Sequence, residues 1–263
     1  MRDPEVIYSV IKRGVAFLGG MGTLIFLPLP VMAQSPEPAQ LLQEMDEALR
    51  GHSLQATLSF DVQTVSWQRH YIMKFWTQGL DYALARLINP PKVEGQGFLR
   101  VQSRVWNYLP TAERVILIPV SLMTQPVLGS DFATDDLVKL SYLARDYDAV
   151  IIGEETLEGF ETYQLELKPK PDAPVSYEKL EVWLRKADSA PVRITFYDEK
   201  QQPLRSLHYS QFQMLGGRER PMVWRMENHR DKGRQTILTL QEAVYDLELS
   251  DSLFTRENLE KYP

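Results

Sequence analysis

The sequence predicts a mainly β protein built on a strongly curved antiparallel sheet, or half-open β-barrel, with helices against its concave face. Two observations support this fold class. Segments that alternate apolar and polar side chains follow one another from residue 54 to residue 243, giving about ten or eleven strands. Tight-turn sequences such as Gly216-Gly217 separate many of them, which is typical of antiparallel hairpins. A sheet of this size curls or closes.

The first element predicted after the N-terminal segment is an amphipathic helix over residues 39–50. Four apolar side chains fall on one helical face, and Gly51 follows as the C-terminal residue. The apolar residues of this face are Leu41, Leu42, Met45 and Leu49.

From residue 54 the apolar period changes to two, which predicts a half-buried strand over 54–62. Further strands are predicted at similar spacing, among them 69–77, two short strands within 98–108, and 114–118. A long connection then contains Gly129 and Ser130 and ends in a helix-prone turn at 134–138. The tail at 252–261 favours a last helix that docks Phe254 and Leu259 inward.

Residues 1–33 have the features of a cleavable export signal. Lys12 and Arg13 precede an apolar run at 14–29, and a small-residue site places cleavage between Ala33 and Gln34. The run is shorter than the roughly 20 residues of a membrane span, although an anchor that stays attached is the alternative. We therefore predict a periplasmic protein with one domain over residues 34–263.

Composition excludes several classes of function. The chain carries a net charge of −6 and has no evident basic stripe, which argues against binding nucleic acid or anionic lipid surfaces. It contains no cysteine, so thiolate chemistry is excluded and the protein is not itself N-acylated at a cysteine.

No sequence pattern indicates catalysis or a metal site. The four histidines lie far apart, without the spacing of a zinc motif. Ser130 lacks the surrounding glycine pattern of a nucleophile elbow, so we interpret it as a turn residue. We predict a protein that is not an enzyme and has no cofactor. A hydrolase would need a cluster formed only by folding.

Several predicted strands carry bulky residues on both faces, which a sheet covered on one face does not need. Two interpretations stay open. Either helices and loops cover the second face and make a dry core, or the sheet curls around an apolar cavity. All five tryptophans fall in predicted strands, and periodicity does not separate the two interpretations.

An ordered set of short motifs runs through the chain after the signal. They are GQGFLRV from Gly95, WNYLP at 106–110, SLM at 121–123, LGSDF at 128–132, DDL at 135–137, YQLEL at 163–167, and SLFT at 252–255. In this order and spacing they resemble the outer-membrane lipoprotein-sorting protein family, which is related to the periplasmic carrier LolA.

The resemblance implies a half-open antiparallel barrel with a helical lid over a cavity that takes up acyl chains of lipoproteins or lipids. It implies that the helix at 39–50 and the turn from Phe132 to Leu137 form the lid. The candidate cavity or lid residues are Leu41, Leu42, Met45, Leu49, Trp76, Phe98, Trp106, Tyr108, Phe132, Leu137 and Trp183.

A carrier of this kind would exchange its cargo with an inner-membrane exporter and an outer-membrane acceptor. The alternative is a periplasmic sensor or interaction module of the same fold that partners an inner-membrane protein or transporter. Stable complex formation that lipid only modulates would distinguish this second hypothesis from the first.

Overall fold

The computed structural model describes residues 36–134, 136, 143–173, 175 and 177–261. Pro36–Pro263 is one compact unit. The predicted signal with its cleavage site at Ala33 and Gln34, and the predicted lid residue Leu137, lie outside the described residues. None of the helices among the described residues has the length and hydrophobicity needed to cross a membrane.

The described helices are few and short. The α-helices are α1 Pro38–Arg50, α3 Leu143–Asp146 and α4 Arg256–Glu260, and the 3₁₀ turns are η1 Pro91–Val93, η2 Pro110–Ala112, η3 Val120–Leu122, η4 Val127–Gly129 and η6 Asp251–Phe254. The predicted N-terminal helix is confirmed. It starts where the Glu37 side chain accepts a hydrogen bond from the Gln40 N–H at 3.1 Å, and it ends at Gly51, whose φ is +61°.

Thirteen strands form one sheet in the described part of the chain, two or three more than predicted. The short strands β4 to β6 lie where strands were predicted, at 98–108 and 114–118, so the predicted total was too low although these segments were identified. The strands are β1 Ser53–Gln63, β2 Gln68–Gln78, β3 Tyr82–Asn89, β4 Gly97–Val101, β5 Arg104–Leu109, β6 Arg114–Leu117, β7 Tyr147–Leu157, β8 Phe160–Pro169, β9 Lys179–Arg185, β10 Pro191–Tyr197, β11 Pro203–Leu215, β12 Arg218–Asn228 and β13 Gln235–Tyr245.

The strand order explains how the chain crosses the sheet. It is β6-β5-β4-β3-β2-β1-β13-β12-β11-β10-β9-β8-β7, with every adjacent pair antiparallel. The chain runs outward from β1 to the edge strand β6, then starts again at the opposite edge strand β7 and returns to pair β13 with β1. The segment 118–146 must therefore pass from one edge of the sheet to the other.

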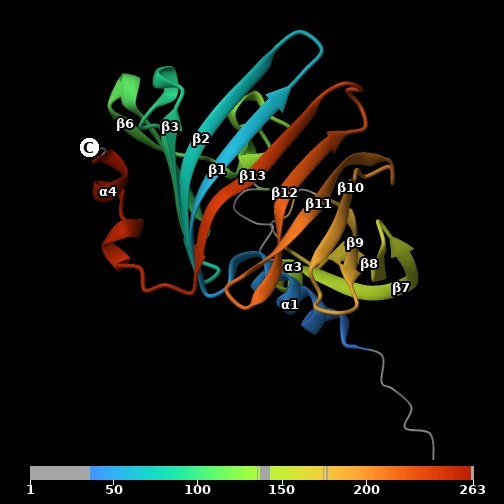
Figure 1. The fold of residues 1–263 in the computed structure, drawn as a ribbon. Coiled ribbons are helices and arrows are strands. Elements are labelled where there is room, and N and C mark those ends of the chain that lie inside the picture. The colour runs from blue at the N-terminus through green and yellow to red at the C-terminus, as the bar shows by residue number, and fades with distance from the viewer. Residues whose placement is uncertain (1–35, 135, 137–142, 174, 176, 262–263) are drawn as a thin grey trace, which may run out of the picture. The chain divides into compact units, whose positions relative to one another are not determined.

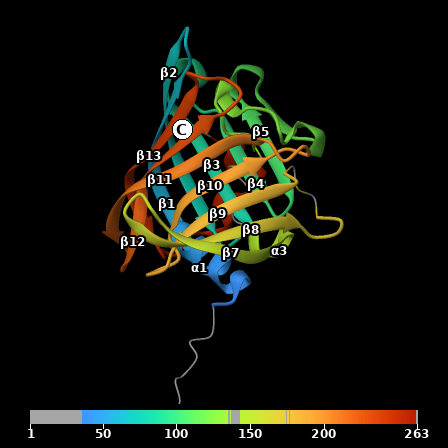
Figure 2. The ribbon, with the colours of Figure 1, turned by 90° about the vertical axis from the view of Figure 1, so that its right-hand side faces the viewer.

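The sheet is strongly curved and open, as predicted (Figures 1 and 2). β6 and β7 do not pair with each other, so the barrel is unclosed. Register irregularities fall within five strand pairs, at Thr57/Leu58, Ile72/Met73, Ile151/Gly153, Pro191/Arg193 and Phe196/Tyr197. Bulges of this kind bend a strand and increase its twist, which helps a thirteen-stranded sheet to curl.

The two faces of the sheet bury different clusters. The large core lies on the concave face, where α1 packs Leu41, Leu42, Met45 and Leu49 against the strands. A smaller cluster on the other face of β3 and β4 joins Leu84 and Leu99 to Phe254 and Leu259 of the tail. The predicted inward docking of the tail is thus confirmed. Bulky residues on both faces of β3 to β5 follow from this second layer.

Candidate functional site

An apolar cavity lies between the concave face of strands β1 to β5, the C-terminal half of α1 and the segment 127–136. Its volume is about 100 Å³, and sixteen of the twenty-two residues that line it are apolar. Pockets for drug-sized ligands usually begin at roughly 300 Å³. The space in this structure therefore suits a short apolar group, and a longer one requires the cavity to open.

Small side chains in β3 create this space. Ala85 pairs with Phe75 of β2 and Phe98 of β4 in the register of the sheet. Ala83 lies two residues earlier in β3 and therefore on the same face. All four residues line the cavity. Because alanine has no atoms beyond Cβ, the two phenylalanine rings stand on either side of a gap that their neighbour does not fill.

Charged groups lie at the α1 side of the cavity wall. Asp46 and Arg50 form an ion pair one helical turn apart, and Arg100 of β4 is 3% exposed. Burial raises the pKa of Asp46 above its usual value, and the positive charges of Arg50 and Arg100 partly oppose this shift. The wall is therefore not uniformly apolar, since Arg50, Arg100, Asp46 and, on the opposite side, Asp136 line it.

The segment from Gln125 to Asp136, which we call the lid loop, covers the cavity. Its two arms are joined by backbone hydrogen bonds from the Val127 N–H to the Phe132 oxygen at 2.8 Å and from the Thr134 N–H to the Gln125 oxygen at 3.3 Å. The Phe132 ring is fully buried, with its centroid 5.6 Å from that of Phe60 in β1. The lid loop is thus fastened to the sheet by an aromatic side chain.

The tip of the lid loop needs unusual backbone angles. Leu128 and Gly129 both have positive φ, at +56° and +73°. The buried Ser130 hydroxyl accepts a hydrogen bond from the Phe132 N–H at 3.1 Å and donates one to the Phe132 oxygen at 3.2 Å. The interpretation of Ser130 as a turn residue is therefore confirmed.

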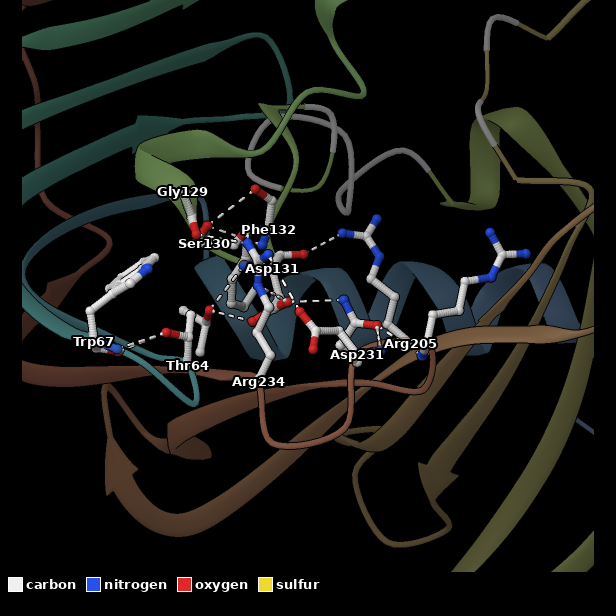
Figure 3. A network of polar contacts seen from close by, with 12 residues as sticks. Thr64, Trp67, Gly129, Ser130, Asp131, Phe132, Arg205, Asp231 and Arg234 are labelled. Atoms are coloured by element: carbon white, nitrogen blue, oxygen red, sulfur yellow. Dashed lines mark hydrogen bonds and ion pairs between the residues drawn. The ribbon is translucent and has the colours of Figure 1, made fainter.

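Asp131 ties the lid loop to β12 and β13 (Figure 3). Its fully buried carboxylate accepts hydrogen bonds from Asn228 Nδ2 at 3.1 Å and Thr236 Oγ1 at 2.9 Å, and Arg234 Nε lies 2.9 Å from it as an ion pair. Arg234 also donates to the carbonyl oxygens of Gly129 at 2.8 Å and Ser130 at 3.0 Å. These contacts fix the loop tip at the end of the sheet where β12 meets β13.

Asp136 is a second anchor on the opposite side of the lid loop. Its carboxylate, 1% exposed, pairs with Arg205 of β11 at 2.9 Å and accepts hydrogen bonds from the Tyr177 hydroxyl at 2.8 Å and the Ala133 N–H at 2.7 Å. Arg205 also donates to the Asp131 carbonyl oxygen. The loop is thus bound to the sheet mainly by charged and polar contacts, whereas α1 is bound mainly by apolar packing.

Three of the predicted site residues line the cavity: Leu49 on α1, Phe98 on β4 and Phe132 in the lid loop. The other predicted helix residues lie in the same concave core without bordering the cavity, namely Leu41, Leu42 and Met45. Leu137 is outside the described residues. The structure therefore brings the helix, the sheet and the lid loop together around one space.

Four of the predicted aromatic residues in strands, unlike Phe98, lie on the other face. Trp76, Trp106 and Tyr108 pack with the tail cluster of Leu84, Leu99, Phe254 and Leu259. Trp183 alternates with Leu180, Val182 and Leu184 of the concave core, and the Arg193 guanidinium stacks 3.8 Å from its ring centroid. Because side chains alternate along a strand, the rings of Trp76, Trp106 and Tyr108 point away from the cavity that β2 and β5 help to form, and Trp183 lies on a strand that does not line it.

Sequence reasoning missed several residues of the site. Trp224 lines the cavity from β12. The sequence signal for it was its spacing of two residues from Met222 and Met226, which places all three on the same face of the strand. Arg100 belongs to the GQGFLRV motif, but nothing in the sequence marked it as a residue of the cavity wall. The partners of Asp131 lie about 100 positions away in the chain, so only the fold reveals the role of that residue.

The described residues contain no group of three or more histidine, aspartate or glutamate side chains that could hold a metal ion. One serine and histidine lie close together, with Ser206 Oγ 2.9 Å from His229 Nε2. Ser206 is 4% exposed and lies 3.0 Å from Thr195 Oγ1 on the neighbouring strand. This pair bridges strands and offers no accessible nucleophile.

Comparisons with known proteins give the family. A family model described as "Uncharacterized protein" matches residues 79–261. Among curated proteins, none matches this chain. A solved structure of a domain named for outer-membrane lipoprotein sorting, from Vibrio parahaemolyticus, is 26% identical, with a TM-score of 0.76, and the alignment covers 85% of this chain and 98% of that one.

Two further solved structures share the fold. A DUF1329 family protein from Desulfovibrio piger is 24% identical with a TM-score of 0.78, over 84% of this chain and 97% of that one. A LolA superfamily protein from Nitrosomonas europaea is 21% identical with a TM-score of 0.73, over 85% of this chain and 100% of that one. The chain belongs to the family of the matching model, and its predicted resemblance to outer-membrane lipoprotein-sorting proteins of LolA-like fold is confirmed.

Proposed function

We propose that this protein is a periplasmic carrier that binds the acyl chains of lipoproteins or lipids and shields them on the way to the outer membrane. The observation that carries this proposal is the apolar cavity beneath the lid loop. Residues 1–33 would direct export and be removed between Ala33 and Gln34, leaving residues 34–263 as one binding domain. The named role of the Vibrio domain in lipoprotein sorting agrees with this assignment.

The energetics suit a non-covalent carrier. Burying a methylene group gains about 0.8 kcal/mol, so ten methylenes contribute about 8 kcal/mol before ordering costs, which corresponds to roughly micromolar binding. The observed cavity of about 100 Å³ holds about three groups of the size of a water molecule, at about 30 Å³ each. Uptake of a whole acyl chain therefore requires part of the cover to move.

The lid loop is the part best placed to move. Helix α1 is held by four buried apolar side chains and by Arg220, which is 1% exposed and donates to the carbonyl oxygens of Glu47 at 2.9 Å and Ala48 at 2.6 Å. The lid loop places Phe132 and Val127 in the apolar interior, but its remaining side-chain anchors to the sheet are mainly polar groups that water or a partner can replace. We infer that cargo enters as the loop lifts and that α1 stays in place.

Binding of acyl chains of increasing length to delipidated protein tests the proposal. The binding free energy should become more favourable by about 0.8 kcal/mol per methylene until the opened cavity is full, and then level off. Leu58→Asp, which puts a carboxylate in the cavity wall, should weaken binding. Val150→Asp, on the exposed edge strand β7, is the control and should not.

Saturable binding that depends on chain length supports the carrier. Its absence in protein that is folded by circular dichroism contradicts it. The inner-membrane exporter and outer-membrane acceptor that such a carrier needs would act on the lid loop, since cargo this tightly held leaves slowly unless the cavity is opened.

A further inference from the structure

We propose that the tips of the β1–β2 and β12–β13 hairpins form a docking surface for an anionic phospholipid bilayer. This inference rests on the proposed function, because it identifies the surface from which the carrier would take or to which it would give its cargo. The two tips are residues 61–70 and 229–235, and together we call them the rim. They lie side by side, because a Cβ atom added at Gly233 would be 3.1 Å from Val65 Cγ2.

The rim presents an apolar side chain on a fixed turn. Val65 is 85% exposed, the highest value among the large hydrophobic residues exposed in the described chain. Its turn is closed by hydrogen bonds from the Thr64 N–H to the Trp67 oxygen at 2.9 Å and from the Trp67 N–H to Thr64 Oγ1 at 3.0 Å. A valine held outward in this way is ready to enter an interface without losing conformational freedom.

Two cations in the rim stay without an acidic partner among the described residues, on a chain whose net charge is −6. The rim contains Arg69, Arg230, Lys232 and Arg234 against Asp61 and Asp231, and Arg230 and Arg234 also pair with Asp198 and Asp131 outside it. Arg69 and Lys232 form no ion pair with any residue that the structure describes. Each basic side chain near an anionic bilayer strengthens binding about fivefold.

Trp67 adds the third feature of an interfacial anchor. The Arg69 guanidinium stacks 4.4 Å from the Trp67 ring centroid, so an amphipathic indole and a cation stand directly behind the exposed valine. An apolar tip, an indole and basic side chains together match the boundary between acyl chains and phosphate groups. An acidic protein surface would satisfy the charges but leave no apolar layer for Val65.

The rim also contacts the lid loop. A Cβ atom added at Gly129 would lie 3.7 Å from Trp67 Cη2, and Arg234 donates to the Gly129 oxygen at 2.8 Å. Figure 3 shows Thr64, Trp67, Gly129 and Arg234 gathered at this end of the sheet. Docking through the rim therefore brings the tip of the lid loop to the bilayer surface, where cargo would leave or enter.

Co-sedimentation of the purified protein with vesicles tests this inference. Binding is expected with vesicles of equal parts phosphatidylglycerol and phosphatidylcholine, and not with phosphatidylcholine alone. Raising the ionic strength from about 0.1 M to about 1 M, which shortens the Debye length from about 10 to about 3 Å, should weaken it at least tenfold. Lys232→Gln should weaken it about fivefold, and Val65→Asp by more.

Val244→Asp is the matched control, because Val244 is 55% exposed and lies at the end of β13 farthest from the rim. It should leave vesicle binding unchanged. No binding to the anionic vesicles, or equal binding by Val65→Asp and Val244→Asp, would overturn the docking surface. Acyl-chain binding measured on the same variants keeps the two proposals separate, because rim variants should retain it even where vesicle binding is lost.

Discussion

Filling the gap at Ala85 should block acyl-chain uptake while leaving the fold intact. Ala85 faces the cavity between Phe75 and Phe98, so the ring in Ala85→Phe would occupy the space that a ligand needs. The cavity of about 100 Å³ corresponds to about three methylene-sized groups. Losing their burial removes about 2.4 kcal/mol at 0.8 kcal/mol each, or about fifty-fold in affinity.

The stability of Ala85→Phe should change little. Burying the new ring gains up to about 3 kcal/mol, and overpacking costs about 1 to 3 kcal/mol, so the free energy of unfolding should stay within roughly 2 kcal/mol of the original. A displacement assay with a fluorescent fatty acid and a urea unfolding curve measure the two quantities. Val115→Phe, which adds the same ring to the tail cluster on the other face, is the control. Uptake by Ala85→Phe equal to that of the control would refute the location of the binding site.

Three further perturbations test the lid loop and the cavity wall. Gly129→Val should strain a residue with φ of +73° by about 1 to 2 kcal/mol and should reduce acyl uptake more than global stability. The control is Gly79→Val, with φ of +53° and open space around it, which should leave uptake unchanged. Equal loss of uptake and stability in Gly129→Val would count against a movable loop. Asp131→Ala leaves Arg234 and its neighbours without their buried anion and should lower the free energy of unfolding by about 3 to 5 kcal/mol, measured by thermal or urea unfolding. A decrease of less than about 1 kcal/mol would show that the anchor is dispensable. The raised pKa of Asp46 means that the folded state holds this proton to higher pH than the unfolded state, so its contribution to stability falls as pH rises above the ordinary value of 3.8. Asp46→Asn should therefore flatten the pH dependence of the melting temperature as pH rises from that value, and an unchanged slope would contradict this.

The strands were predictable because each has one face in the core. In β1, Leu54, Ala56, Leu58, Phe60 and Val62 are all buried, and this strict alternation is visible without coordinates. The sequence could predict only that the sheet is curved, since a sheet of so many strands has to bend. The total number of strands was underestimated, although the short strands β4 to β6 were themselves predicted, at 98–108 and 114–118.

The concave face could not be identified from the sequence. In β3 to β5 both faces are apolar, because the tail covers one of them and the cavity lies against the other. Large aromatic residues such as Trp106 attract attention as ligand contacts, yet here they pack under the tail. The cavity depends instead on small residues, Ala83 and Ala85, and a missing side chain gives no positive signal in a sequence.

The contacts of the lid loop were also beyond sequence reasoning. Asp131 and Asp136 stood out only as members of short motifs, and their partners Arg205, Arg234 and Thr236 lie far along the chain. The fold brings them together, because Asp131 and Asp136 of the lid loop contact side chains of β11 and of the β12–β13 hairpin. Net charge was misleading in a similar way, since a chain of −6 still has Arg69 and Lys232 in the rim without an ion pair to any described residue.

Lipid extraction and mass spectrometry of the protein purified from its native host, without detergent, tests the central claim most directly. We expect acylated cargo in a stoichiometric amount, and less of it in Ala85→Phe purified in the same way. Empty protein that also fails to take up an apolar fluorophore would contradict the carrier function, and the interaction module with a closed core would then be the better account.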